Sequence, residues 1–357
     1  SVVPVFVGSA TLAGLADRFP RRLVMIACDV IRCVLVLVMA IPAMPLALLI
    51  VLLFAVTLVG APFTAARAAL YPDVLAGERY VVGTAVALTT NQFAQVLGFA
   101  LGGAAVGFLG VRASLVVDAA TFVASALIVV AWVRPRPAPA SRGASAGGPG
   151  AAGAAGSDGG LLATVRFVFG TAALRWPMLF GWLAAFYNAP EGVAAPLARH
   201  LGGGATAVGV ILAAQVFGES AGMLVFSRVV RQESRLRWMS PLAVAACAVL
   251  AAFALLPALG GVVVILAASG AFGAYQLAAN AAFVKAVPPA QRGRSFGLAQ
   301  GGMSLGQGAV MIVAGAAAQQ FAPSSVLAVI GAAGAGCALL IAVGWSRAGR
   351  PRNAADA

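Results

Sequence analysis

Charged residues are scarce in this sequence. Only 9% of the 357 residues are charged, against about 25% in an ordinary soluble domain, and 62% are hydrophobic, against about 45–50%. A water-soluble surface on a chain of this length would need far more charge. The composition therefore predicts a membrane protein.

Histidine, cysteine and lysine are also rare, and each scarcity excludes a kind of site. The single histidine, His200, cannot form an H-E-x-x-H zinc site. The single lysine, Lys285, follows no glycine-rich loop and no Walker A motif is present, which excludes ATP hydrolysis by this chain. Four cysteines stand singly in apolar segments and indicate packing rather than a disulfide or metal site. They are Cys28, Cys33, Cys247 and Cys337. We expect no metal, no cofactor and no enzymatic activity.

Long apolar segments, by contrast, are abundant. A bilayer core about 30 Å thick needs about 20 apolar residues per helix, and eleven segments follow one another along the chain. They span residues 1–16, 23–42, 45–66, 80–110, 113–133, 172–194, 204–227, 238–257, 260–287, 293–320 and 323–346. Because the first is short and begins inside an apolar run, we expect that one further helix precedes it and is missing from this sequence.

The formal net charge of +13 follows a pattern along the chain. Cations gather in the odd-numbered gaps between segments and in the C-terminal tail, whereas the even-numbered gaps hold at most one each. Since basic loops stay in the cytoplasm, the odd gaps and the C-terminus are predicted to be cytoplasmic. Topology thus explains the charge without nucleic acid. We expect a multi-pass protein of the cell membrane, with the lipid bilayer as a partner and no nucleic acid partner.

A segment rich in Pro, Ala, Gly and Ser divides the helices. Residues 134–160 are predicted to be a flexible cytoplasmic linker. It separates an N-terminal bundle, 1–133, from a C-terminal six-helix bundle, 161–346, and residues 347–357 form a cytoplasmic tail. With the expected upstream helix, the chain is all-α with two related six-helix bundles. Directly after the linker, "LLATVRFVFGTAALRW" is either a short interfacial helix or an extended start of the next span.

The gap after the first segment reads "DRFPRR". Asp17, Arg18, Arg21 and Arg22 resemble motif A of the major facilitator superfamily, G-x-x-x-D-R-x-G-R-R, with Pro20 in place of its second Gly. "GAPFTAARAALYPDV", "VPPAQRGRSFGLAQG" and "VLGFALGGAAVG" are similar to further segments of the branch that includes macrolide and enterobactin exporters. The resemblance implies the major facilitator fold and transport by alternating access.

Two interpretations of the "DRFPRR" loop stay open. The resemblance implies a gating latch, in which Asp17 pairs with arginines or with the positive end of a helix. Alternatively, Arg18, Arg21 and Arg22 simply hold the loop in the cytoplasm. Anchoring does not require Asp17, which favours the latch.

Four ionisable residues lie inside predicted spans, where charge is costly and often functional. Asp29 and Arg32 are three residues apart on one helix and are predicted to form an intramembrane ion pair. Asp118 is a candidate for proton coupling, although a structural contact is favoured. Glu219 lies nine residues before Arg228, about 13–14 Å along the helix and so near the middle of the bilayer. Ionised there, it would cost about 2.5–3.5 kcal/mol. It is therefore either the proton-coupling group or a protonated Glu bonded to a neighbouring helix.

Neutral amides are the remaining polar groups in the spans. Each either binds substrate or bridges helices, and the resemblance places them on helices that line the substrate cavity. The candidates are Asn91, Gln92, Gln95, Gln215, Gln276, Asn280, Gln300 and Gln307. Gly218 and Gly222, four residues apart, predict close packing of one helix on another.

These features predict a secondary active transporter that moves small amphipathic compounds across the cytoplasmic membrane. Because ATP hydrolysis is excluded, an ion gradient is the energy source, and proton-coupled efflux is the favoured direction. An uptake permease or a lysolipid flippase on the same fold is the alternative. We expect a monomer whose partners are a small-molecule substrate and protons.

Overall fold

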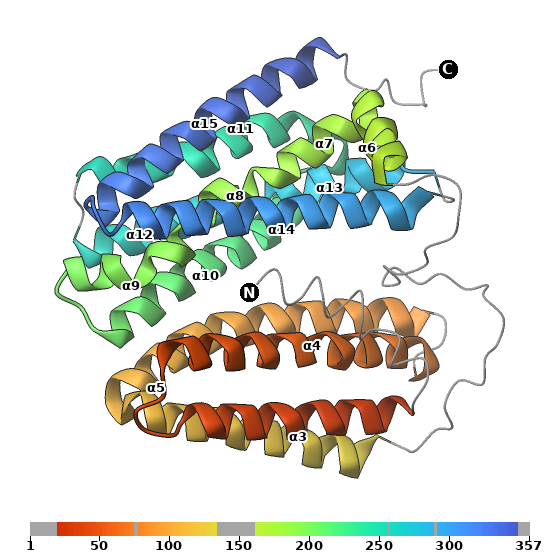
Figure 1. Ribbon diagram of the computed structural model, residues 1–357. Helices are drawn as coiled ribbons and strands as arrows, with labels where there is room; N and C mark the ends of the chain where they lie inside the picture. Colours follow the sequence, from red (N-terminus) through yellow and green to blue (C-terminus); the bar gives the residue numbers. More distant parts are fainter. Residues whose placement is uncertain (1–19, 75–77, 134–160, 256–257, 289–290, 349–357) are drawn as a thin grey trace. The chain divides into compact units, whose positions relative to one another are not determined.

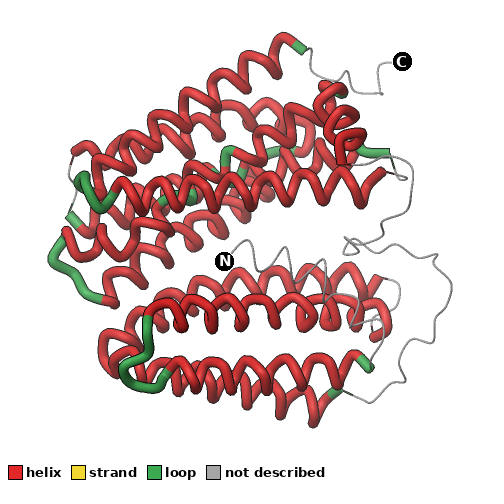
Figure 2. The backbone as a smooth tube through the Cα atoms, in the orientation of Figure 1, coloured by secondary structure: helices red, strands yellow, loops and turns green. Residues whose placement is uncertain are grey.

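The computed structural model describes residues 20–74, 78–133, 161–255, 258–288 and 291–348. All secondary structure in these ranges is helical (Figures 1 and 2). The first predicted span, the predicted linker and most of the predicted tail lie outside them. The described helices fall into two compact units, each of which is described by itself.

The first unit is built around one face of its first described helix. It holds α3 (Arg21–Met39), α4 (Leu46–Val74) and α5 (Glu78–Trp132) except for residues 92–104. Val24, Met25 and Cys28 share a face of α3 because their spacing follows the helical repeat. They pack against Ala66 of α4 and Val129 of α5. This contact joins all three helices of the unit.

A glycine interrupts the long helix α5. Gly110 has φ 79° and ψ 168°, a conformation that residues with a side chain rarely adopt, and its neighbours on both sides are helical. The break separates residues 80–110 from 113–133, the two spans predicted from the sequence. The position of the predicted boundary is thus confirmed, although the connection is one kinked residue rather than an open loop.

The second unit contains the remaining helices together with residues 92–104 of α5. Its elements are α6 (Leu161–Gly170), α7 (Ala172–Trp182), α8 (Ala184–Tyr187), α9 (Pro190–His200), α10 (Ala205–Val229), η1 (Gln232–Ser234), α11 (Arg235–Ala248), η2 (Val249–Leu255), α12 (Leu259–Phe272), α13 (Tyr275–Ala286), α14 (Arg292–Ala317) and α15 (Pro323–Arg347). The predicted spans 80–110 and 113–133 are the two parts of α5, and each other predicted span after the first corresponds to one described helix or to a consecutive group of them.

Two of the predicted spans are broken helices. The span predicted at 172–194 consists of α7, α8 and α9 and continues to His200, while the span at 260–287 consists of α12 and α13. Pro190 lacks a backbone N–H and begins α9, so regular helical hydrogen bonding stops before it. Such breaks leave backbone carbonyl groups that need other donors inside a membrane.

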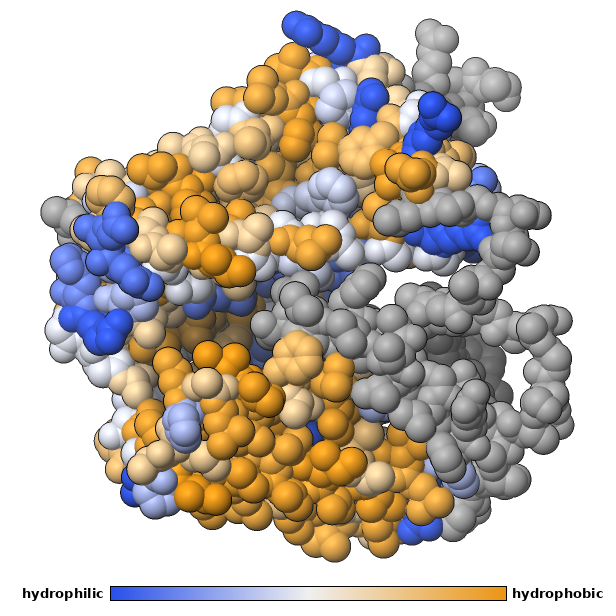
Figure 3. Space-filling view, viewed as in Figure 1, coloured by the Kyte–Doolittle hydropathy of each residue, from blue (hydrophilic) through white to orange (hydrophobic). Residues whose placement is uncertain are grey.

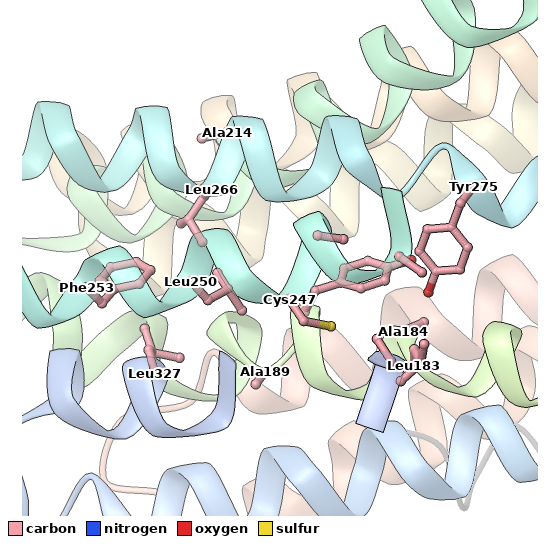
Figure 4. Packing of buried hydrophobic residues seen from close by; sticks show 14 of the residues in the cluster. Leu183, Ala184, Ala189, Ala214, Cys247, Leu250, Phe253, Leu266, Tyr275 and Leu327 are labelled. Atoms are coloured by element: carbon pink, nitrogen blue, oxygen red, sulfur yellow. The ribbon is translucent and has the colours of Figure 1, made fainter. Parts of the chain in front are cut away.

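The core of the second unit is built from close helix contacts and a few large side chains. Gly218 and Gly222 of α10 lie directly against backbone atoms of Ala267 and Ala271 on α12, where no Cβ fits. The close packing predicted for this glycine pair is confirmed. Figure 4 shows the larger side chains, with Leu250 and Phe253 near Leu327, and the Tyr275 ring extending toward Leu183 and Ala184.

The helix after the linker is a separate element. Helix α6 is bent by 101° from the helix that starts at Ala172. Arg175 Nη1 donates to the Phe169 carbonyl oxygen at 3.2 Å, which holds the corner between α6 and α7. Of the two interpretations of this segment, the structure supports a separate short helix.

Six helices in the described ranges are long and apolar enough to cross a membrane, or seven if the bent pair of α6 with α7–α9 is one span. One of them, at residues 90–132, is 43 residues long and contains the Gly110 break. Side chains of α4 such as Leu46, Ile50 and Val51 are more than half exposed. Figure 3 shows hydrophobic residues over much of the visible surface. Exposed apolar faces of this kind fit a lipid environment.

Candidate functional site

The described part of the "DRFPRR" loop lies at the start of α3. Asp17 and Arg18 lie outside the described residues. Arg22 Nη2 donates to the Val130 carbonyl oxygen at 2.6 Å, in the last turn of α5. A cation at the C-terminal end of a helix interacts favourably with the helix dipole. Arg22 therefore ties the beginning of α3 to the end of α5 within the first unit.

The first unit also holds a charged cluster, formed by Asp29, Arg32 and Asp118. The Asp29 side chain is 1% exposed, and its Oδ2 accepts a hydrogen bond of 2.7 Å from Ser125 Oγ on α5. Arg32 interacts electrostatically with Asp29 and with Asp118. The hydrogen-bond partner of the buried carboxylate is thus Ser125, while Arg32 compensates its charge.

Two aromatic rings hold the guanidinium of Arg32. Its Cζ lies 5.4 Å from the centroid of the Phe63 ring on α4 and 5.6 Å from that of Phe122 on α5. The guanidinium also lies directly against Gly60 of α4. Cation–π contacts of this kind stabilise a partly desolvated arginine. Arg32 thus links α3 to α4 and α5, which is a structural role.

The second unit holds a larger polar group, which we call the polar cluster. It consists of Tyr187, Asn188, Glu191, Gln215, Glu219 and Gln276. Its side chains come from α8, α9, α10 and α13 and from the residue that follows α8. These elements meet beside the break between α8 and α9.

Gln215 forms the hydrogen bonds that close this break. The backbone N–H of Glu191 donates to Asn188 at 3.1 Å, so the Tyr187 carbonyl lacks its usual helical donor. Gln215 Nε2 donates to that carbonyl at 2.8 Å and to Asn188 Oδ1 at 3.0 Å. Both N–H groups of the amide are therefore used. Its Oε1 is buried without a hydrogen-bond partner among the described residues.

The α7–α8 break receives its donors from α13. Tyr275 donates its hydroxyl hydrogen to the Phe180 carbonyl at 3.0 Å, and Gln276 Nε2 donates to the Gly181 carbonyl at the same distance. Gln276 Nε2 also lies 3.3 Å from the Tyr187 hydroxyl. The Phe180 and Gly181 carbonyls also accept from the backbone N–H of Leu183, so the polar side chains on α13 add a second donor to each carbonyl beside the break.

Two carboxyl groups belong to the polar cluster. Glu219 lies in the middle part of α10 and is half-buried, within hydrogen-bonding reach of Gln215. It interacts electrostatically with Glu191 of α9 and with Tyr187. Among the described residues, no cation acts on either carboxyl group. Among the described residues the pair therefore has no side-chain cation, unlike the acids of the first unit.

The other predicted cavity amides are more scattered. Gln92, on the α5 segment that belongs to the second unit, donates to Ser220 Oγ at 3.5 Å, next to Glu219 in sequence. Gln307 is partly buried on α14. The remaining candidates are exposed: Asn91, Gln95, Asn280 and Gln300. The structure thus brings Gln92, Gln215 and Gln276 close to Glu219 or its neighbours, and a substrate role for all eight stays a prediction.

Sequence reasoning missed Tyr187, Asn188 and Glu191. The signal that could have found them is the pattern Asn188, Pro190, Glu191 within an apolar span, because a proline inside such a segment frees backbone groups and a nearby acid is rarely incidental. Asn188 and Glu191 flank the break, where their side chains join those of α10.

The helices and the polar cluster define a multi-pass membrane protein with an acid pair on which no described cation acts. The chain belongs to the Major Facilitator Superfamily, whose family model matches residues 1–190 and 192–357. It is therefore a secondary transporter for small molecules and not an enzyme. No curated protein matches the chain.

Solved structures share the fold. A POT family transporter in complex with 5-aminolevulinic acid matches with TM-score 0.71 and 9% identity, over 97% of this chain and 86% of that chain. The nucleoside transporter NupG matches with TM-score 0.65 and 14% identity, over 98% and 91% of the two chains. A bacterial homolog of the human lysosomal transporter Spinster matches with TM-score 0.64 and 16% identity, over 96% and 86%. At these identities the likeness concerns the fold.

Proposed function

We propose that this transporter exports small amphipathic compounds across the cytoplasmic membrane in exchange for protons, with Glu219 as the proton-carrying group. The observation that carries the proposal is the environment of Glu219, a half-buried carboxyl in the middle of α10 without a cation near it among the described residues. A carboxylate inside a membrane is costly unless it is paired or protonated. Binding a proton removes that cost, and releasing the proton restores it.

The hydrogen bonds around Glu219 support exchange rather than permanent pairing. Gln215 has only two N–H groups, and both already serve Tyr187 and Asn188. The amide therefore cannot also satisfy an ionised Glu219 fully without weakening one of these bonds. Loss and gain of a proton at Glu219 would change the hydrogen bonds at the α8–α9 break. The protonation state of Glu219 would thereby be coupled to the backbone conformation at this break.

The resemblance of the "DRFPRR" loop and its flanking segments to drug exporters supports the export direction. In the proposed mechanism the loop regulates the cytoplasmic side, where Arg22 holds α3 on the end of α5. The C-terminus lies in the cytoplasm, as the distribution of arginines predicts.

Proton movement in everted membrane vesicles tests this function. With an acidic lumen, addition of a transported amphipathic compound should make the lumen more alkaline, because compound enters as protons leave. Glu219→Gln should abolish the response at unchanged protein level. The matched control is Glu233→Gln, an exposed glutamate in η1 between α10 and α11, which should respond normally.

Two results would contradict the proposal. An unchanged response in Glu219→Gln would remove this carboxyl from coupling. If the wild type shows no proton movement and instead carries compounds in the direction of uptake into the cell, the uptake permease is favoured. If it moves lysolipid alone, the flippase is favoured.

A further inference from the structure

We propose that the end of the second unit formed by α6, α13 and α14 binds an anionic phospholipid, whose headgroup contacts Arg166, Lys285 and Arg292. We call these three residues the basic corner. The distribution of arginines predicts that this end faces the cytoplasm. The inference does not depend on the coupling ion or on the direction of transport, because none of the three residues belongs to the polar cluster.

One apolar cluster brings the three helices together. Val168 of α6 is 0% exposed and packs in this cluster with Phe283 of α13 and Phe296 of α14. The two phenylalanine rings stand edge to face, with centroids 5.4 Å apart. Figure 1 shows α6 at the end of the unit where α14 begins. Each cation of the basic corner is within four residues of one of these three apolar side chains, so the cluster holds the cations at one end of the unit.

Helix α6 has the features of a helix that lies on a membrane surface. It is bent by 101° from the helix that starts at Ala172, and the bond from Arg175 Nη1 to the Phe169 carbonyl oxygen fixes the corner. A helix bent this far from a membrane-crossing helix lies close to the membrane plane. It presents Leu162, which is 84% exposed, and Arg166, one helical turn later. An exposed leucine beside an exposed arginine fits the boundary between acyl chains and headgroups.

The cations of the basic corner have no acid to pair with. Helices α6, α7, α13 and α14 contain no Asp or Glu. Arg166, Lys285 and Arg292 are exposed, and none forms a hydrogen bond or ion pair with another described residue. Arg175 differs, because it bonds Phe169 and its Cζ lies 4.7 Å from the centroid of the Trp176 ring. The three exposed cations therefore favour an anion from outside the protein.

The beginning of α14 adds backbone donors in an open position. Gln291, the residue before the helix, makes no side-chain hydrogen bond to the first turn, where backbone N–H groups lack helical partners. A Cβ added at Gly293 would meet no atom within 4 Å, so the surface is open here. Helix N-termini bind phosphate through such N–H groups. Together with Arg292 they fit the phosphate of a headgroup, while Leu162 fits an acyl chain.

Lipid retention by the purified full chain tests the inference. The protein in neutral detergent is mixed with equal amounts of dioleoylphosphatidylglycerol and dioleoylphosphatidylcholine, and native mass spectrometry counts each lipid on the protein. The wild type should retain phosphatidylglycerol preferentially. Each of the substitutions Arg166→Gln, Lys285→Gln and Arg292→Gln should weaken the preference about fivefold, the factor for one basic residue near an anionic membrane surface. The triple variant should abolish it.

A matched triple variant removes the same charge elsewhere on the unit. Arg228, Arg231 and Arg237 are exposed arginines at the junction of α10 and α11, two helices that contribute no residue to the apolar cluster. Their replacement by glutamine should leave the preference unchanged. Leu162→Ser should weaken retention of phosphatidylglycerol, because the acyl chain loses its contact. Glycerol 3-phosphate, which has the phosphate without acyl chains, should not displace the lipid.

Three results would overturn the inference. Equal retention of the two lipids by the wild type would show that no anionic lipid site exists. Equal losses in the two triple variants would show that net charge, and not the basic corner, attracts the lipid. Displacement by glycerol 3-phosphate at the concentration of the lipid would assign the corner to a soluble anion. If the triple variant of the basic corner unfolds at a lower temperature than the wild type, Arg166→Gln alone decides the test by its fivefold loss.

Discussion

In the first unit Asp29 and Asp118 share the charge of Arg32, whereas in the second unit Glu191 and Glu219 have no cation near them among the described residues. Both groups of acids lie on helices of a membrane protein, where charge is costly. The difference lies in what compensates that cost. Arg32, held by two aromatic rings, compensates the acids permanently, and its side chain joins helices. An acid pair without an arginine needs a proton or a ligand, and is free to exchange them.

The largest effect on stability should come from removing Arg32, the cation of the charged cluster in the first unit. Arg32→Met should destabilise the first unit by about 3–5 kcal/mol, the range for leaving a buried charge without its partner. It also removes the contacts with Phe63 and Phe122. Thermal unfolding in detergent measures the loss. The double variant with Asp29→Asn should recover part of it, and no recovery would show that charge compensation is not the role of Arg32.

The next effect concerns the donors that close the α8–α9 break. Gln215→Leu leaves the Tyr187 carbonyl and Asn188 Oδ1 without their side-chain donor, at about 1–3 kcal/mol for each acceptor left unsatisfied. Unfolding temperature should fall clearly. Gln215→Glu keeps the size but adds charge and removes the donors, so it should not rescue stability. A neutral result for Gln215→Leu would show that water satisfies these groups.

A smaller effect is expected at Ser125. Its hydroxyl donates to Asp29 Oδ2, and Ser125→Ala removes this bond while Arg32 still compensates the charge. We expect a loss of about 1–2 kcal/mol, near the value for a hydrogen bond to a charged group. Transport should persist. Loss of proton exchange in Ser125→Ala, at normal protein level, would show that the first unit takes part in proton coupling, contrary to the comparison.

The smallest effect on stability should come from Glu219→Gln. An amide fits where the carboxyl stood and carries no charge, so unfolding temperature should change little or rise. A large loss of stability would mean that the Glu219 carboxyl holds the helices together, in the manner of Asp29.

The sequence predicted much of this arrangement because apolar length and arginine placement report directly on membrane crossing. The helices, the boundary between the spans at 80–110 and 113–133, and the tight packing of Gly218 and Gly222 followed from residue type alone. Glu191 did not. The predicted span at 172–194 placed Glu191 near its end, and the sequence analysis did not single it out. In the structure α9 begins at Pro190 and continues through Pro196 to His200, so Glu191 lies in its first turn, directly after a helix break.

Side-chain partners were also beyond sequence reasoning. The spacing of Asp29 and Arg32 predicted that they pair electrostatically, but it did not point to the hydrogen bond that Asp29 accepts from Ser125, 96 residues away in sequence. Gln215 and Gln276 predicted either substrate contacts or helix bridges. The structure shows both as donors to backbone carbonyls at helix breaks, which depend on tertiary contacts.

The central claim is that an uncompensated acid carries the proton and a compensated one does not. Proton movement in everted vesicles, driven by the same compound, should be compared for Glu219→Gln and Asp118→Asn at matched protein levels. The account predicts that Glu219→Gln abolishes the response. It predicts that Asp118→Asn preserves it, because Asp118 interacts electrostatically with Arg32. Loss of the response in Asp118→Asn with a normal response in Glu219→Gln would contradict the account.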